Sequence, residues 1–361
     1  MRGDGSYRVY EHEHVNANVQ YAEGGGKAGK SDVLKFSGKD GMLICKYYTK
    51  RGITMIESAA VLGAGAVGSY VIWGLSGLEG VRLGVVAEGE RAERLRNRGC
   101  KINDKIYHPQ VWSPKEARQA DLLVVALKYT ALSGAMELIQ ETVGENTIVM
   151  SLMNGVDSEE KIAEKVGDAH MLYSVIKIAS HREGEGFYFD PETTVGIIFG
   201  EKEAPYDSEK VKAVEELFAR SPLHFQATEY IMEELWSKFR LNVCDNLPQA
   251  ILGAGVGCYQ DSIHMKAISD ELRKELEKIA KAKGVDLSKV EDSSKLRSVV
   301  PKSARYSTLQ DLDAGRQTEI EMFSGALVKM GKELGIPTPY NEYTYHMIKA
   351  LEEKNTGKFD Y

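Results

Sequence analysis

Three glycines, Gly63, Gly65 and Gly68, do more than any other feature to limit the folds open to this chain. They follow a short apolar run at 58–62 and precede a helix-forming run at 67–78, which is typical of a strand, a tight turn and a helix. The turn consists of Gly63, Ala64, Gly65, Ala66, Val67 and Gly68. The first glycine permits the bend, the second lets the backbone approach a pyrophosphate, and the third lets the helix pack on the strand. The segment predicts a dinucleotide-binding turn with phosphates at the helix N-terminus; a ligand-free glycine turn is the simpler alternative.

Strand-like and helix-like runs alternate after this turn. Apolar runs at 81–87, 121–127 and 147–152 predict strands, and polar amphipathic runs at 91–98 and 132–142 predict helices between them. Such alternation is typical of a parallel sheet whose faces are both covered by helices.

Two further strand-like runs, 171–180 and 194–199, flank a Gly-rich turn at 183–186, and we expect them to extend the sheet antiparallel.

Beyond residue 228 the pattern becomes helical. Helices are expected at 230–252, 264–283, 320–334 and 343–353. The sequence therefore predicts an α/β fold: a Rossmann-type dinucleotide-binding domain at 55–228, followed by an all-helical C-terminal domain at 229–361 for substrate and catalysis. A length of 361 residues suits two domains.

Residues 1–54 lack this periodicity and are predicted separately from the two domains. Nine Lys or Arg against six Asp or Glu give them a charge of +3. We expect this extension to lie outside the catalytic fold and Met55 to be the natural start; a genuine flexible extension is the alternative. The run Glu11-His12-Glu13-His14 has metal-binding residue types, but two histidines in a solvated tail explain it more simply, and no metal site is predicted.

Composition narrows the class of function. The whole chain carries −7, and the 37 basic and 47 acidic residues of 55–361 give −10, so no nucleic-acid or anionic-membrane partner is expected. No apolar run is long enough for a membrane helix. Four cysteines stand far apart, and we expect reduced thiols in a cytoplasmic protein. They are Cys45, Cys100, Cys244 and Cys258.

Glu88 lies twenty residues beyond Gly68, at the end of the second predicted strand. A carboxylate there accepts hydrogen bonds from the adenosine ribose and repels a 2′-phosphate, which favours NAD(H) over NADP(H). Arg91 and Arg94 follow closely and keep NADP(H) open.

Polar residues also follow the next two strands and mark one helix. Lys128 and Asn154 come at the carboxyl edge of the sheet, where ligands of open α/β sheets bind.

Lys238, Asn242 and Asn246 are spaced four apart, so a regular helix would place them on one face. A lysine with two uncharged amides suits a polar cleft for carbonyl reduction, in which Lys238 donates a proton or stabilises the oxyanion. A simple Asn-Gly turn and a solvated helix face are the alternatives.

Downstream, Ser307 and Glu319 stand in a polar stretch that leads into a new helix. Ser307 is a candidate for binding a substrate carboxylate, and Glu319 for holding Lys238. Helix capping is the alternative for each.

At these positions the chain resembles the ketopantoate reductase (2-dehydropantoate 2-reductase) family. Besides the glycine turn, Lys128 and Asn154-Gly155, the resemblance rests on three longer motifs. These are Leu235-Trp236-x-Lys238-x-x-x-Asn242-x-x-x-Asn246, the run from Ser307 through Leu309-Gln310-Asp311 and Ala314-Gly315-Arg316 to Thr318-Glu319-Ile320, and Gly335-Ile336-Pro337-Thr338-Pro339 with Asn341. It covers roughly residues 56–353.

The resemblance implies two-domain architecture and reduction of ketopantoate, a small 2-oxo acid, to pantoate with NADPH on the route to coenzyme A. It implies Lys238 as general acid, with Glu319 beside it and beside the nicotinamide ribose. Asn242, Asn246 and Ser307 are implied to bind the 2-oxo acid, Asn154 to lie between cofactor and substrate, and Lys128 to lie near the cofactor. Family members are often homodimers.

The chain departs from the family pattern at three positions. NADPH-dependent members usually carry Arg where this chain has Glu88, many have Pro at the position of Leu247, and a substrate-binding Asn is common at the position of Val256. An NAD-dependent D-2-hydroxy-acid dehydrogenase of the same family is therefore one alternative. A non-catalytic dinucleotide-binding regulator is another, but a sensor needs neither Lys238 nor Glu319.

Overall fold

The computed structural model describes residues 33–36, 44–47, 55–298 and 300–359. The chain divides into two units, 1–53 and 54–361. In the first unit β1 (Val33–Phe36) and β2 (Ile44–Tyr47) pair antiparallel. The Glu-His run at 11–14 lies outside the described residues. The separate status of residues 1–54 and the start at Met55 remain predictions.

The second unit contains an eight-stranded sheet. Its strands, in order across the sheet, are β14 (Phe225–Ala227), β13 (Gly196–Gly200), β10 (Met171–Lys177), β9 (Ile148–Ser151), β8 (Leu122–Val125), β3 (Ser58–Leu62), β4 (Arg82–Val86) and β7 (Gln110–Trp112). All neighbouring strands are parallel except β10 and β13, which are antiparallel.

The expectation that the run at 171–180 is antiparallel was wrong, whereas that for the run at 194–199 is confirmed by β13. β10 is parallel to β9 because an unpredicted helix, α5 (Ser158–Val166), returns the chain to the opposite end of the sheet between them. The end of the 171–180 run instead begins a second sheet at Ser180.

That second sheet has four short strands and packs beside the first helix. Its order is β11 (Ser180–Glu183), β12 (Gly186–Phe189), β5 (Cys100–Ile102) and β6 (Lys105–Tyr107). The rings of Tyr70, Trp73 and Phe189 lie within 5.6 Å of one another, centre to centre, and join it to that helix.

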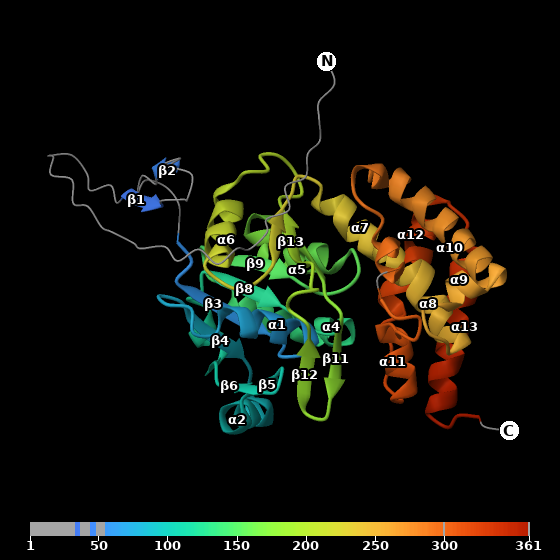
Figure 1. Ribbon diagram of the computed structural model, residues 1–361, viewed down its shortest axis with the longest axis horizontal. Coiled ribbons are helices and arrows are strands. Elements are labelled where there is room, and N and C mark those ends of the chain that lie inside the picture. The colour runs from blue at the N-terminus through green and yellow to red at the C-terminus, as the bar shows by residue number, and fades with distance from the viewer. Residues whose placement is uncertain (1–32, 37–43, 48–54, 299, 360–361) are drawn as a thin grey trace, which may run out of the picture. The chain divides into compact units, whose positions relative to one another are not determined.

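Helices cover both faces of the large sheet (Figure 1). Along β8, Leu122 and Val124 face the cluster that includes α1 (Ala66–Leu75) and α6 (Glu209–Ala219), while Leu123 and Val125 face the other. The other face is covered by α3 (Pro114–Ala117), α4 (Tyr129–Thr142) and α5, and α2 (Gly89–Arg98) follows β4. The four residues of β8 are fully buried, which explains their uninterrupted apolar sequence.

The C-terminal part is helical. Its α-helices are α7 (Ile231–Leu241), α8 (Leu247–Leu252), α9 (Cys258–Asp261), α10 (Ile263–Ala282), α11 (Ser307–Asp313), α12 (Ala326–Leu334) and α13 (Pro339–Asn355). Two π-helices, Asn242–Asn246 and Glu321–Gly325, interrupt the predicted runs 230–252 and 320–334.

Short 3-10 helices occur in both parts of the second unit, at Asp168–His170 in the sheet part and at Leu287–Lys289 and Ser293–Ser298 in the helical part.

One apolar core continues from the sheet into these helices. Val149 and Val175 of the sheet belong to the same buried cluster as Leu235 and Phe239 of α7. In Figure 1, α7 leads from the sheet to the orange and red helices. The predicted fold class, a Rossmann-type domain followed by a helical domain, is confirmed. The boundary at residue 228 stays a prediction, and none of the described helices is long and apolar enough to cross a membrane.

The glycine turn is built by close backbone contact. Gly63 has φ +106°, and a Cβ there would lie 2.4 Å from the carbonyl oxygen of Ala126. At Gly68 a Cβ would lie 1.8 Å from the carbonyl oxygen of Gly63. A Cβ added at Gly65, by contrast, would have no described non-neighbouring atom within 4 Å. Gly63 and Gly68 are therefore required by packing, whereas Gly65 leaves open space above the turn.

This difference gives a test of the packing. Gly68→Ala forces the backbone of the turn apart, so we expect the free energy of unfolding to fall by about 1–3 kcal/mol, as overpacking usually costs. Thermal unfolding of Gly65→Ala is the matched control, because that methyl group meets open space. Equal melting temperatures for the two variants would contradict the packing argument.

Candidate active site

The predicted site residues of the sheet lie at one edge. The glycine turn follows β3, Lys128 follows β8 as the N-cap of α4, and Asn154 follows β9. These three strands are neighbours and parallel, so their carboxyl ends meet. This is the edge at which open α/β sheets bind ligands.

Three polar residues from separate segments meet beside this edge. Lys238 of α7 donates a hydrogen bond from Nζ to Oδ1 of Asn154, over 2.8 Å. Nδ2 of Asn154 donates in turn to Oε2 of Glu319, over 3.0 Å. The structure thus brings Lys238 and Glu319 together through the Asn154 amide, whereas the sequence suggested a direct contact.

Burial changes the acidity of this lysine. Lys238 is partly buried, and loss of hydration lowers the pKa of its ammonium from the ordinary value near 10.5 to about 8. The negative charges of Glu319 and Glu159 act in the opposite direction, and the positive charge of Lys177 adds to the decrease. A lysine with such a pKa can exchange a proton near neutral pH.

The backbone of α4 fixes the second oxygen of Glu319. The N–H of Tyr129, the first residue of α4, donates to Oε1 of Glu319 over 3.0 Å. A carboxylate at a helix N-terminus is favoured by the helix dipole. Sequence reasoning missed Tyr129, because a backbone donor carries no residue-type signal.

Lys128 is paired with a carboxylate. Its Nζ lies 2.9 and 2.8 Å from the two oxygens of Asp311, which also accepts from Nε of Arg316 at 2.8 Å. Asp311 was not predicted as a site residue, although it stands in the Leu-Gln-Asp motif. The pair joins the end of β8 to α11.

The amides after Lys238 are arranged differently from the prediction. Asn242 and Asn246 lie in a π-helix, where i→i+5 hydrogen bonds widen the turn. The assumption of one regular helical face was therefore wrong in its geometry. Asn246 donates from Nδ2 to Oγ of Ser307 over 3.2 Å and accepts from the N–H of Thr308. Among the described residues, none accepts a hydrogen bond from the buried Nδ2 of Asn242.

Glu88 lies at the carboxyl end of β4, next to the strand that leads into the glycine turn. It is exposed, it is the N-cap of α2 directly after β4, and its side chain makes no capping hydrogen bond. β4 neighbours β3, which ends in the glycine turn. The position fits an adenosine ribose, and the glycine turn fits a pyrophosphate, because Gly65 leaves space and no side chain caps α1.

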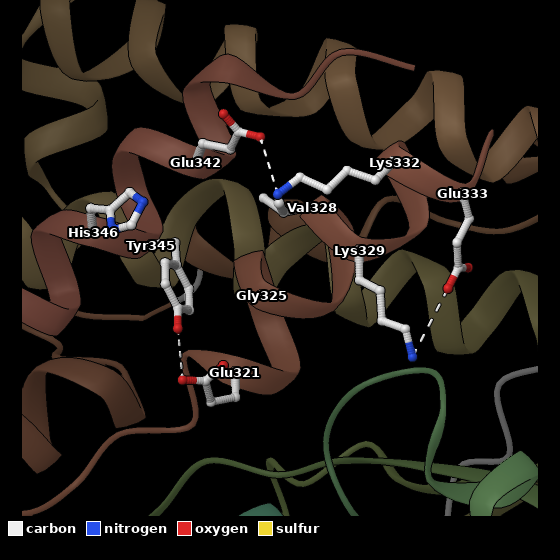
Figure 2. A pocket seen from close by; sticks show the side chains of 9 residues that line it. All are labelled: Glu321, Gly325, Val328, Lys329, Lys332, Glu333, Glu342, Tyr345 and His346. Carbon is white, nitrogen blue, oxygen red and sulfur yellow. Dashed lines mark hydrogen bonds and ion pairs between the residues drawn. The ribbon is translucent and has the colours of Figure 1, made fainter. Parts of the chain in front are cut away.

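The surface groove drawn in Figure 2 is separate from these residues. Its volume is about 560 Å³, and α12, α13 and the π-helix Glu321–Gly325 line it. Lys332 points to Glu342, Lys329 to Glu333, and Tyr345 donates to Glu321. Its charges are paired within the groove wall, and none of the predicted site residues lines it.

Comparison with known proteins identifies the family of the chain. The family model described as ketopantoate reductase PanE/ApbA matches residues 59–199, and the model of its C-terminal domain matches 230–352. The 2-dehydropantoate 2-reductase of Pyrococcus horikoshii is 30% identical over 308 residues, which cover 82% of this chain and 98% of that protein.

Two solved structures share the fold. A ketopantoate reductase of this family from Ralstonia eutropha has a TM-score of 0.71 and 22% identity over 83% of this chain and 99% of its own. A D-mandelate dehydrogenase with NADH and anilino(oxo)acetate has a TM-score of 0.72 and 20% identity over the same shares.

The Rossmann-type sheet with its glycine turn, together with these family matches, identifies the chain as an NAD(P)-dependent oxidoreductase. The chain belongs to the ketopantoate reductase family.

The influence of Glu319 on Lys238 is open to direct measurement. Glu319→Gln removes the negative charge that raises the pKa of Lys238, so we expect that pKa to fall below 8 by on the order of one unit. The pH dependence of acetylation at Lys238, followed by mass spectrometry, reports the change. Glu321→Gln serves as control, because that exposed carboxylate contacts Tyr345. An unshifted Glu319→Gln profile would disprove the coupling.

Proposed function

We propose that this protein reduces a 2-oxo acid, with ketopantoate as the first substrate to test and Lys238 as the proton donor. The observation that carries the proposal is the contact of Lys238 with Asn154, and through it with Glu319, at a pKa of about 8. The name of the Pyrococcus relative supports the choice of substrate.

The chemistry follows from the needs of a carbonyl group. When bound, the nicotinamide cofactor supplies a hydride to the carbonyl carbon. The oxygen then gains negative charge and needs a nearby proton. The ammonium of Lys238 has three donors, of which Asn154 takes one, so the others can be directed to the substrate oxygen.

Asn154 orients this donor without adding charge. Its Oδ1 accepts from Lys238 and its Nδ2 donates to Glu319, so both ends of the amide are occupied and its rotation is restricted. Glu319 is held by the N–H of Tyr129. The three residues together fix the ammonium for proton transfer, which depends on close alignment.

Uncharged donors are proposed to bind the carboxylate of the substrate. The Nδ2 of Asn242 has no acceptor among the described residues, and a buried amide without a partner is costly unless a ligand completes it. Ser307 accepts from Asn246, which leaves its own hydroxyl proton to donate. We assign Asn242, Asn246 and Ser307 to substrate binding and Lys128 to the cofactor side of the site.

The cofactor is proposed to be NAD(H) rather than NADP(H), because the exposed carboxylate of Glu88 stands at the end of β4 and makes no capping hydrogen bond. The same feature favours a second candidate function, an NAD-dependent D-2-hydroxy-acid dehydrogenase. Rates of NADH and NADPH oxidation with ketopantoate and other 2-oxo acids distinguish the two.

Lys238→Ala tests the proton donor. We expect kcat to fall at least 10²-fold, the typical contribution of general acid catalysis, while binding of the dinucleotide measured by fluorescence is retained. In the intact protein, reduction should decline as the pH rises through about 8, because only the protonated lysine donates. Lys283→Ala, at an exposed position, is the control. Full activity of Lys238→Ala would reject the role.

Glu88→Arg tests the cofactor assignment. Replacing a carboxylate that repels the 2′-phosphate by a cation should raise the ratio of kcat/KM for NADPH over NADH by about tenfold or more. Glu90→Arg makes the same charge change two residues away on the exposed surface of α2. Similar ratios in both variants would show that the position of Glu88 is not decisive.

A further inference from the structure

A second lysine lies near Lys238 in a buried ion pair. Nζ of Lys177, the last residue of β10, lies 2.6 Å from Oε2 of Glu234 in α7. The two side chains are only 11% and 12% exposed. The family resemblance and the sequence motifs gave this pair no role.

The pair is close to the proposed proton donor. Glu234 precedes Lys238 by four residues in α7, so the two side chains are neighbours on one helix face. α7 packs against β10, which carries Lys177. The positive charge of Lys177 is felt at Lys238, where it lowers the pKa of the ammonium.

The charged groups that face Lys238 come from each element around it. Glu319 reaches it through Asn154 from the segment before the second π-helix, and Glu159 acts from α5. Lys177 acts from β10, and Glu234 is its neighbour within α7. Of these, Lys177 is the cation.

Stability alone does not explain why an ion pair occupies this place. Removing two charges from water is costly, and an apolar pair of similar volume often stabilises a protein equally well or better. A carboxylate one helical turn from Lys238, paired with an ammonium from β10, provides something that an apolar pair cannot, which is an electric field at the donor.

We propose that Lys177 and Glu234 are positioning residues that set the pH range in which Lys238 donates its proton. This inference rests on the proposed role of Lys238. Burial is the main cause of the low pKa of Lys238; Lys177 opposes the charge of Glu319 and adds to that decrease, while Glu234 holds Lys177 in place and limits its effect. The substrate touches neither residue in this scheme.

Opposite charge changes must then have opposite effects. Lys177→Met leaves Glu234 as an unpaired anion and should move the pKa of Lys238 upward. Glu234→Gln leaves Lys177 as an unpaired cation and should move it downward. Each shift is expected to be on the order of 0.5–1 pH unit, as for charges within a helical turn. The pKa of Lys238 in the double variant should lie between those of the two single variants. Lys177→Arg keeps the positive charge and should leave that pKa unchanged.

Two readouts separate this inference from the proposed function. The pH profile of kcat/KM reports the acid in the free enzyme. The pH dependence of acetylation at Lys238 reports the same pKa without any need for turnover. If Lys238→Ala keeps its activity, the proposed function fails, while the acetylation shifts still test the electrostatic pair.

Matched controls come from the same helix. Glu233, next to Glu234 in sequence, is buried and pairs over 3.4 Å with Lys289, whose side chain is more exposed than that of Lys177. Glu233→Gln and Lys289→Met therefore make the same charge changes in the adjacent ion pair of α7. They should leave the pKa of Lys238 unchanged. Glu159→Gln removes a group that burial gives a pKa of about 7, and repeating the measurements in that background separates its titration from that of Lys238.

The outcome decides clearly. Shifts of opposite sign, with unchanged controls, support the proposal. Shifts of the same sign, or none, in Lys177→Met and Glu234→Gln overturn it and leave the pair a structural link between β10 and α7. If Lys177→Met or Glu234→Gln unfolds, Lys177→Gln or Glu234→Ala makes the same charge change with another side chain, and the expected sign of the shift stays the same.

Discussion

The hydrogen bond from Lys238 to Asn154 is the contact on which the site depends. Asn154 belongs to the edge of the sheet, whereas Lys238 and Glu319 come from the helical part, so the amide joins the two. A partly buried ammonium is costly without such a partner. The apolar cluster shared by β9, β10 and α7 holds these segments in register beneath the bond. The packing of the core therefore determines the geometry of the donor.

Much of the fold could be predicted because its central strands have strong patterns. β8 and β9 are buried on both faces and have uninterrupted apolar sequences. The short strands β5, β6, β11 and β12 were missed, since three or four partly exposed residues give no periodicity. The direction of β10 was predicted wrongly because the crossover helix α5 was not recognised in its polar sequence. With that helix between them, β9 and β10 are parallel. Direction depends on what lies between strands, and local pattern does not show it.

Site residues could be predicted where the side-chain type itself indicates chemistry. They could not be predicted where the function depends on backbone geometry or on contacts between distant segments. Lys238, Asn154 and Glu319 were identified, and the structure brings them together. The π-helix at Asn242 leaves no mark in a residue pattern, because it depends on the backbone hydrogen bonds. Tyr129 contributes a backbone N–H, and Lys177 finds Glu234 only when β10 packs on α7. Contacts between distant segments require the fold.

Charge explains why one lysine is singled out. The chain carries −7 overall, so attraction for an anionic oxo acid must be local. Lys128 and Lys177 each have a carboxylate partner, Asp311 and Glu234 respectively. Lys238 instead donates to an amide, and no carboxylate of the described residues forms an ion pair with it. Under the proposed role, the substrate carboxylate itself brings negative charge to the site and raises the pKa of Lys238. The donor is thereby protonated most fully when the substrate is bound, and it becomes a stronger acid again when that charge leaves.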